Sequence, residues 1–213
     1  MEATIYDLLK SKKTDEIIDE LRKDPKLFES RDSGGASLLM LSFYFRNQEL
    51  SDYILLHRKP ADIYEAAIAG DLIAIKNFLE ADKDLLDAHS RDGFTALGFA
   101  AFFNRPEVAK VLLDLGADPN VASTNDFRVA PIHSSVAAKS FEITKMLLEH
   151  GANPDAKQQN DVTPLHEAAH NNTPAIARIL LECGASKDLK TSDGKSAMDF
   201  AKEINAIEII EML

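Results

Sequence analysis

One sequence pattern recurs along the chain at a nearly constant interval. Its fullest copy is Thr163–Ala169, which reads TPLHEAA, and Leu165 can serve as the anchor position of that copy. Equivalent anchors occur at Ile5, Leu39, Ile63, Leu97, Ile132 and Met198. From the first anchor to the last, the successive spacings are 34, 24, 34, 35, 33 and 33 residues. A unit of this length cannot bury its apolar face alone, so the chain has to fold as a stack of consecutive units.

The second half of each period carries a matching signature. Leu112–Asn120, Leu147–Asp155 and Leu180–Asp188 all follow the pattern LLxxGA. Together with TPLHxA at a period near 33, this pattern resembles ankyrin repeats, strongly over residues 63–213 and weakly over residues 1–62. The resemblance implies an all-α ankyrin-repeat solenoid of about six to seven stacked helix–turn–helix units with projecting hairpin loops.

The anchors divide one single domain, residues 1–213, into consecutive units. The spacing of 24 residues indicates that the hairpin after the second unit is missing, which predicts a locally irregular groove. Extra residues at 124–129 predict an enlarged hairpin tip. The terminal units have the polar outer faces that caps need. We expect an N-terminal capping unit at 1–30, a short irregular repeat at 31–60, repeats at 61–90, 91–123, 124–157 and 158–190, and a C-terminal capping unit at 191–213.

The charge of the chain narrows the classes of partner. It has 24 basic and 35 acidic residues, a formal net charge of −11. This balance disfavours nucleic acid, whose binding draws on clustered lysine and arginine. A basic protein partner is compatible with the charge, which can also serve only to keep an extended scaffold soluble. No apolar run approaches the roughly 18 residues that a membrane helix needs, so we expect no membrane partner.

The single cysteine, Cys183, cannot form an internal disulfide, so nothing points to an oxidising compartment. The N-terminus lacks the basic start and apolar run of a signal peptide. We therefore expect a cytoplasmic protein. We also expect a monomer, with self-association through the groove or the apolar end near Ile209, Ile210 and Leu213 as the alternative.

One motif suggests an enzyme. His166, Glu167 and His170 have the H-E-x-x-H spacing of zinc metalloproteases. Two ligands on one helix do not complete a zinc site, and no third ligand is evident nearby. The resemblance implies that His133 and His166 hydrogen-bond locally and tie units together, and Cys183 has no catalytic base beside it. We expect no enzyme, no catalytic residue, no metal and no cofactor, and keep a metal-dependent hydrolase as an alternative.

The candidate binding residues are those that the repeat pattern leaves free. The resemblance implies that partners contact the hairpin tips and the exposed side of the inner helices. The inner-helix candidates follow the Ala-Ala pair and its equivalents, at Tyr44, Phe45, Ile68, Phe102, Phe103, His170 and Asn171. The hairpin-tip candidates are Arg91, Asp92, Phe94, Asn125, Asp126 and Phe127.

These candidates are rich in apolar and aromatic side chains, which is typical of a binding surface. Some of the rings could instead pack between inner helices or fill the gap left by the short unit. We predict a non-enzymatic scaffold that binds a partner protein in its concave groove and at its hairpin tips. Acidic residues such as Asp92 and Asp126 would steer a basic partner, and the anchors would be Phe94, Phe102, Phe103 and Phe127. A self-associating structural protein is the remaining alternative.

Overall fold

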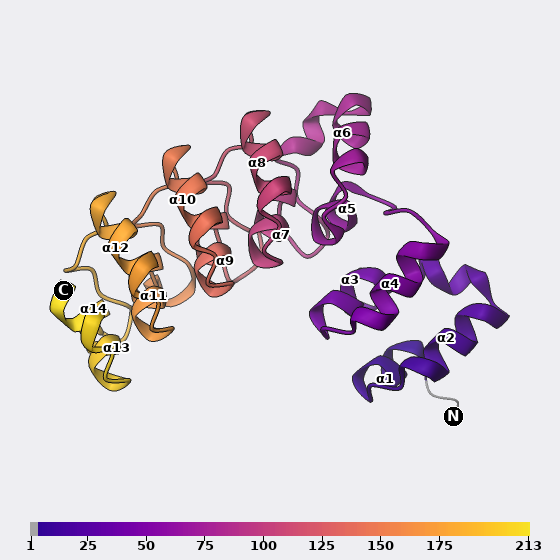
Figure 1. Ribbon diagram of the computed structural model, residues 1–213, viewed down its shortest axis with the longest axis horizontal. Helices are drawn as coiled ribbons and strands as arrows, with labels where there is room; N and C mark the ends of the chain where they lie inside the picture. Colours follow the sequence, from indigo (N-terminus) through magenta and orange to yellow (C-terminus); the bar gives the residue numbers. More distant parts are fainter. Residues whose placement is uncertain (1–3) are drawn as a thin grey trace.

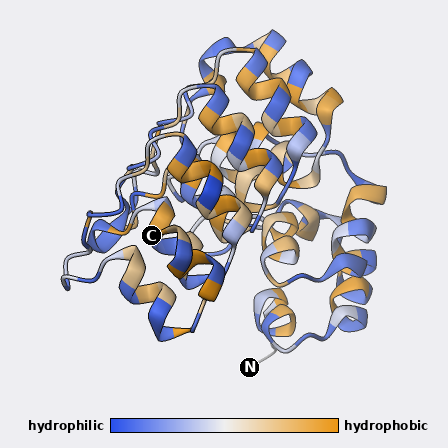
Figure 2. Ribbon diagram, turned by 60° about the vertical axis from the view of Figure 1, so that its left-hand side comes forward, coloured by the Kyte–Doolittle hydropathy of each residue, from blue (hydrophilic) through white to orange (hydrophobic). Residues whose placement is uncertain are grey.

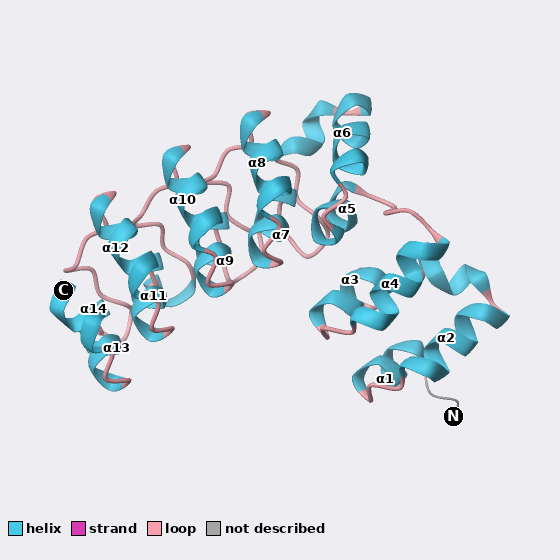
Figure 3. Ribbon diagram, viewed as in Figure 1, coloured by secondary structure: helices cyan, strands magenta, loops and turns pink. Residues whose placement is uncertain are grey.

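The computed structural model describes residues 4–213, which form fourteen α-helices in seven consecutive pairs (Figure 1). Each pair consists of an inner and an outer helix, and the pairs stack side by side. Only helices and loops are drawn for this part of the chain (Figure 3). The predicted all-α solenoid is therefore confirmed. Among the helices of residues 4–213, none is long and apolar enough to cross a membrane.

The inner helices are short and the outer helices slightly longer. The inner helices are α1 (Ile5–Lys10), α3 (Leu38–Tyr44), α5 (Ile63–Ala69), α7 (Ala96–Phe102), α9 (Pro131–Ala137), α11 (Pro164–His170) and α13 (Ala197–Glu203). The outer helices are α2 (Thr14–Lys23), α4 (Gln48–His57), α6 (Leu72–Ala81), α8 (Pro106–Asp114), α10 (Phe141–Glu149), α12 (Pro174–Glu182) and α14 (Ile207–Met212). Three short 3₁₀ turns complete the described helices: η1 (Pro25–Glu29), η2 (Lys83–Leu86) and η3 (Gln159–Asp161).

The TPLH motif explains how an inner helix begins and how it is joined to the next unit. In α11 the backbone N–H of Thr163 donates to Nδ1 of His166 over 3.1 Å, so Nε2 carries the ring proton and donates to the carbonyl of Leu189 over 3.0 Å. His133 makes the equivalent bond to the carbonyl of Ala156, also over 3.0 Å. These imidazoles connect an inner helix to the start of the following hairpin, as the resemblance implies.

The hydrophobic side chains form two separate cores. The residues of α1 to α4 pack mainly among themselves, around Leu21, Leu39 and Ile54. The second core runs from α5 to α14 and includes Met40 of α3 at its edge. The helices that enclose these cores are amphipathic: Figure 2 shows hydrophobic residues in orange and hydrophilic residues in blue on different faces of them.

The boundary between the two cores is the place where a hairpin is missing. Antiparallel bridges mark the hairpins at Arg31–Ser37, His89–Thr95 and Lys190–Ser196, but α4 is joined to α5 by residues 58–62 alone. As a result the first and third hairpin positions come together. A Cβ atom on Gly35 would lie 2.9 Å from Cδ of Arg91. The 24-residue spacing predicts this missing hairpin.

The next hairpin is enlarged. Backbone hydrogen bonds close the hairpins between residues 90 and 94, 158 and 162, and 191 and 195, whereas the corresponding bond spans residues 123 and 129. The wider tip carries Phe127, whose side chain is 57% exposed. The extra residues at 124–129 predict this enlargement.

A buried ion pair replaces the missing hairpin at the boundary. The Arg58 guanidinium donates to both carboxylate oxygens of Glu65, over 2.6 and 2.9 Å, and the N–H of Ala61 donates to the same carboxylate over 2.7 Å. Arg58 also donates to the carbonyl of Phe28 in η1 over 3.2 Å. Burial by itself raises the pKa of Glu65, but these hydrogen bonds outweigh it and hold that pKa below its usual value.

Candidate functional site

Four aromatic rings meet where the two cores join, and we call them the aromatic shelf: Phe43 and Tyr44 of α3, and Phe102 and Phe103 at the end of α7. The ring centroids of Tyr44 and Phe103 are 5.1 Å apart, and those of Tyr44 and Phe102 are 6.0 Å apart. The shelf therefore joins the second unit to the fourth and passes over the end of α5 in the third. The small residues Ala69 and Gly70 end that helix.

The shelf rings are packed against each other and also partly exposed. Tyr44 is 39% exposed and Phe102 is 47% exposed, whereas Phe43 and Phe103 are half-buried against the core. A pocket of about 370 Å³ lies among the shelf rings, and Arg46, Asn104, Ala137 and Ala138 complete its lining. The shelf thus fills the gap beside the short unit and presents an apolar surface at the same time.

Two of the predicted contact residues do not lie on the surface. Ile68 is fully buried, because its side chain belongs to the core that runs from α5 to α14. Arg105 also donates through Nε to the Ile68 carbonyl over 2.7 Å. The prediction of Ile68 as a groove residue is therefore wrong. Phe94 is half-buried and packs on Phe99, with ring centroids 5.5 Å apart, so it is not a free anchor at a hairpin tip.

The other hairpin-tip candidates divide into structural and exposed residues. Asn125 holds the turn: its amide donates to the carbonyl of Asp92 over 2.9 Å, and its side-chain oxygen accepts the N–H of Phe127 over 3.1 Å. The Asp92 carboxylate accepts the hydroxyl of Ser90. Arg91, Asp126 and Phe127 are exposed, so these three remain available to a partner.

Three candidates remain. Phe45 caps the end of α3 and is exposed, and the other two lie away from the shelf. His170 is exposed at the end of α11 and contacts Phe200 edge-to-face, with ring centroids 5.9 Å apart. Asn171 is half-buried, and its carbonyl accepts a hydrogen bond from Lys139 over 3.1 Å. Helix α9 stands between this pair and the shelf. The predicted residues therefore do not form one continuous site.

The H-E-x-x-H motif does not build a metal site. Both ring nitrogens of His166 are engaged in hydrogen bonds, with Thr163 on one side and Leu189 on the other. Within residues 4–213 no group of three or more His, Cys, Asp or Glu side chains lies close enough to hold a metal ion. Glu167 has a carboxylate oxygen that is buried and has no hydrogen-bond partner, and burial raises its pKa to about 7. The motif is explained by the repeat.

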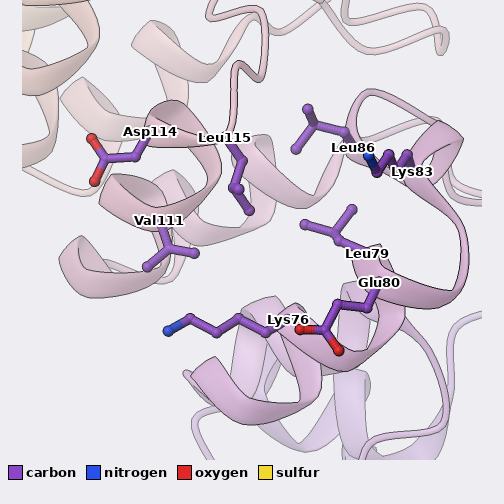
Figure 4. Close-up of a pocket in the computed structure, with 8 residues that line it drawn as sticks. All are labelled: Lys76, Leu79, Glu80, Lys83, Leu86, Val111, Asp114 and Leu115. Carbon is purple, nitrogen blue, oxygen red and sulfur yellow. The ribbon is translucent and has the colours of Figure 1, made fainter.

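A second concavity lies on the opposite, convex side of the molecule, between α6 and α8 (Figure 4). Leu79, Leu86 and Leu115 converge on a pocket of about 570 Å³, and charged side chains stand around its rim. It forms where η2 takes the place of the Gly-Ala ending that the fourth, fifth and sixth units have. Leu115 is 53% exposed, which makes it a useful control position for tests of the concave face.

Sequence reasoning missed three residues of the shelf region: Phe43, Arg46 and Arg105. Phe43 precedes the two positions that the repeat pattern marks as free. Arg46 occupies the turn between inner and outer helix with a φ of 53°, where the third unit has Gly70. A basic residue at a position that favours glycine or asparagine is a signal that could have drawn attention to Arg46.

Comparison with known proteins places this architecture in a family. A model of ankyrin repeats in three copies matches residues 63–158 and 132–213. The chain belongs to the ankyrin-repeat family. Proteins of this family generally act as protein–protein interaction modules.

Three similar proteins illustrate the range of relatives. An ankyrin repeat protein of Acanthamoeba polyphaga mimivirus is 30% identical over 66% of this chain and 19% of its own length. Neurogenic locus notch homolog protein 2 of Homo sapiens is 30% identical over 84% of this chain, and inversin of Mus musculus is 30% identical over 50% of it. The chain spans 7% of the Notch protein and 10% of inversin, so it corresponds to a small part of each relative.

Proposed function

We propose that this ankyrin-repeat protein is a non-enzymatic scaffold that binds a partner protein through its concave groove, with the aromatic shelf as the principal contact. The observation that carries the proposal is the joint packing and exposure of the shelf rings, above all Tyr44 and Phe102. Rigid, partly exposed aromatic side chains beside a pocket are the residues that dominate binding energy at protein interfaces. The exposed residues Asp126 and Phe127 of the enlarged hairpin tip would extend the contact.

The proposal includes a cytoplasmic location and a monomeric state. An exposed, unpaired Cys183 suits a reducing compartment. Two alternatives carry less support. A metal-dependent hydrolase would need His166 free of its two hydrogen bonds. Self-association through the apolar end would use Ile209, Ile210 and Leu213, of which Ile209 is fully buried and the other two are partly buried.

The test compares variants of the two faces. The purified protein is used as bait in a native lysate beside a Tyr44→Ala, Phe102→Ala double variant and a Leu115→Ala control. Loss of two aromatic anchors should weaken capture at least tenfold, whereas the convex control should capture the same partner as the wild type. All three proteins are first compared by circular dichroism and thermal unfolding.

The outcomes separate the two faces. A partner captured equally by the wild type and the double variant would show that the shelf is not the binding site. Loss of capture with the Leu115 control alone would move the site to the convex pocket. A partner lost only with the folded double variant would establish the shelf as the contact surface.

A further inference from the structure

The shelf is bordered by positive charge, although the chain as a whole is strongly negative. Arg46 lines the pocket together with the aromatic rings, and no carboxylate belongs to that lining. The guanidinium carbon of Arg105 lies 5.5 Å from the centroid of the Phe43 ring. Two guanidinium groups therefore flank the aromatic surface of a protein whose formal net charge is −11.

These two guanidinium groups lack the carboxylate partners that four other arginines have. Within residues 4–213, neither Arg46 nor Arg105 has an Asp or Glu oxygen within 4.0 Å. By contrast, four arginines elsewhere make such pairs: Arg22, Arg31, Arg58 and Arg178. In a chain with an excess of acidic residues, a pair of arginines without carboxylates at one surface site can accept carboxylates from another molecule.

The position of Arg105 is fixed by its surroundings. Its Nε donates to the carbonyl of Ile68, and a Cβ atom on Gly70 would lie 3.4 Å from its Cδ. Burial lowers the pKa of Arg105, and the charge of Glu107 only partly offsets this effect. The guanidinium of Arg105 is thus held in place, and its positive charge is only partly balanced by nearby negative charge. This is the arrangement that binds an incoming anion with little loss of side-chain freedom.

We propose that the shelf recognises a short polypeptide segment in which a large apolar side chain is flanked by Asp or Glu. The apolar side chain packs against Tyr44 and Phe102, and the carboxylates pair with Arg46 and Arg105. This inference rests on the proposed function, because it specifies the chemistry of the partner that the shelf binds. It differs from the preference for a basic partner that the net charge suggests, because local charge at the contact determines specificity.

The negative charge around the shelf limits the size of the acidic partner. Burial raises the pKa of the Tyr44 phenol, and the nearby charge of Asp92 raises it further. Tyr44 is therefore a neutral hydrogen-bond donor. A segment with one or two carboxylates can use the two arginines without approaching the acidic remainder of the surface. A long polyanion such as single-stranded RNA would be repelled by that surface.

The experiment selects ligands without assuming a partner. Short random peptides displayed on phage are enriched against the immobilised full chain and sequenced, and the best ones are synthesised for titration by fluorescence anisotropy. We expect enrichment of Asp or Glu next to Phe, Leu or Trp. Arg46→Glu should weaken these peptides at least tenfold, since it replaces a charge-assisted pair with a repulsion. A second selection on the Arg46→Glu variant should prefer Lys or Arg in place of the acidic residues.

Two controls distinguish failure of this inference from failure of the proposed function. Peptides that depend on Phe102 but are basic or neutral would overturn the acidic preference and leave the shelf as a binding site. Peptides that are unaffected by Phe102→Ala would overturn both statements. No enrichment at all would overturn the inference of a short linear segment, and the lysate experiment would still test the scaffold.

A single-stranded oligouridylate is the probe for the competing polyanion. Binding of this RNA to the shelf at physiological salt with the same dependence on Arg46 would overturn the polypeptide assignment. Circular dichroism and thermal unfolding of Arg46→Glu and of the matched variant Arg178→Glu show whether either charge reversal changes the fold. Arg178 lies on α12, and both it and its ion-pair partner Glu208 are exposed, so its reversal should leave the selected peptides bound.

Discussion

The first two units and the last five units are held together by different interactions. In the regular part, neighbouring hairpins are joined by backbone hydrogen bonds, such as Thr124 N–H to the Gly93 carbonyl over 3.0 Å and Ser192 N–H to the Asn160 carbonyl over 2.9 Å. Among the described residues, no such bond leaves the first hairpin, Arg31–Ser37. The first two units instead attach through the Arg58–Glu65 pair, the Arg31–Asp62 pair and the aromatic shelf.

This difference shows what a hairpin contributes to the stack. In the regular part the connection is made by repeated, neutral hydrogen bonds, and losing one leaves its neighbours in place. At the boundary the connection includes one ion pair in which the carboxylate, that of Glu65, is fully buried. A buried charge whose partner is removed is costly, so the boundary should be the most sensitive part of the molecule.

The largest expected effect is therefore at Glu65. Glu65→Ala leaves the Arg58 guanidinium buried without a counter-charge and should destabilise the boundary by about 3–5 kcal/mol. Hydrogen exchange should show residues 5–57 opening before residues 63–213. The control is Glu208→Ala at the exposed pair with Arg178, which should cost less than about 1 kcal/mol. Uniform loss of protection along the chain after Glu65→Ala would contradict this comparison.

A smaller effect is expected inside the regular part, at Glu167. Burial raises the pKa of Glu167 to about 7, so the folded protein holds a proton that the unfolded chain releases near pH 4.5. The contribution of Glu167 to the free energy of unfolding is fully present below pH 4.5 and is lost as the pH rises to about 7. Glu167→Gln should remove this dependence and stabilise the protein at pH 8 by about 3 kcal/mol, with little change at pH 5.

The measurement for Glu167 is urea denaturation of both proteins at several pH values. Burial lowers the pKa of His133 to about 4. The contribution of His133 to the free energy of unfolding therefore has the opposite pH dependence, because it is lost as the pH falls from about 6.5 to about 4. Both proteins contain His133, so its contribution cancels when the free energy of unfolding of the wild type is subtracted from that of Glu167→Gln. A difference that does not grow between pH 5 and pH 8 would show that Glu167 is solvated when charged.

The smallest effect concerns a turn that both regions share. Arg46 in the second unit and Lys139 in the fifth have φ values of 53° and 56° between their inner and outer helices. Replacing either with glycine should stabilise the protein by about 1 kcal/mol, because a left-handed conformation disfavours residues with a Cβ atom. Thermal unfolding measures this, with Asn104→Gly as a control that should gain less. A lower melting temperature for both Gly variants would mean that the side chains contribute more than the strain.

The sequence predicts the parts of this structure that repeat. The positions of the inner helices, the missing hairpin and the enlarged tip follow from spacing within or between units, and the resemblance to ankyrin repeats implies the role of His133 and His166. Each depends on interactions between adjacent units, which the same residue types encode every time. For that reason the sequence predicts both the fold and the approximate number of units, about six to seven.

The shelf could be predicted only in part. Tyr44, Phe102 and Phe103 occupy positions that the pattern marks as free, but nothing in the pattern says that α3 meets α7. That contact arises because the missing hairpin changes the direction of the first two units. The same contact brings Phe43 of the second unit within 5.5 Å of Arg105 in the fourth, which the pattern does not predict either.

The contact between α3 and α7 has a consequence for cooperativity. A solenoid behaves as a one-dimensional array, in which each unit is coupled only to its immediate neighbours. Loss of a hairpin has here added a coupling between the second and fourth units, so that units two to four form a closed circuit of contacts. As long as the Arg58–Glu65 pair is intact, these three units should therefore unfold as one block. The missing hairpin, rather than any single side chain, brings together the two halves of a composite surface.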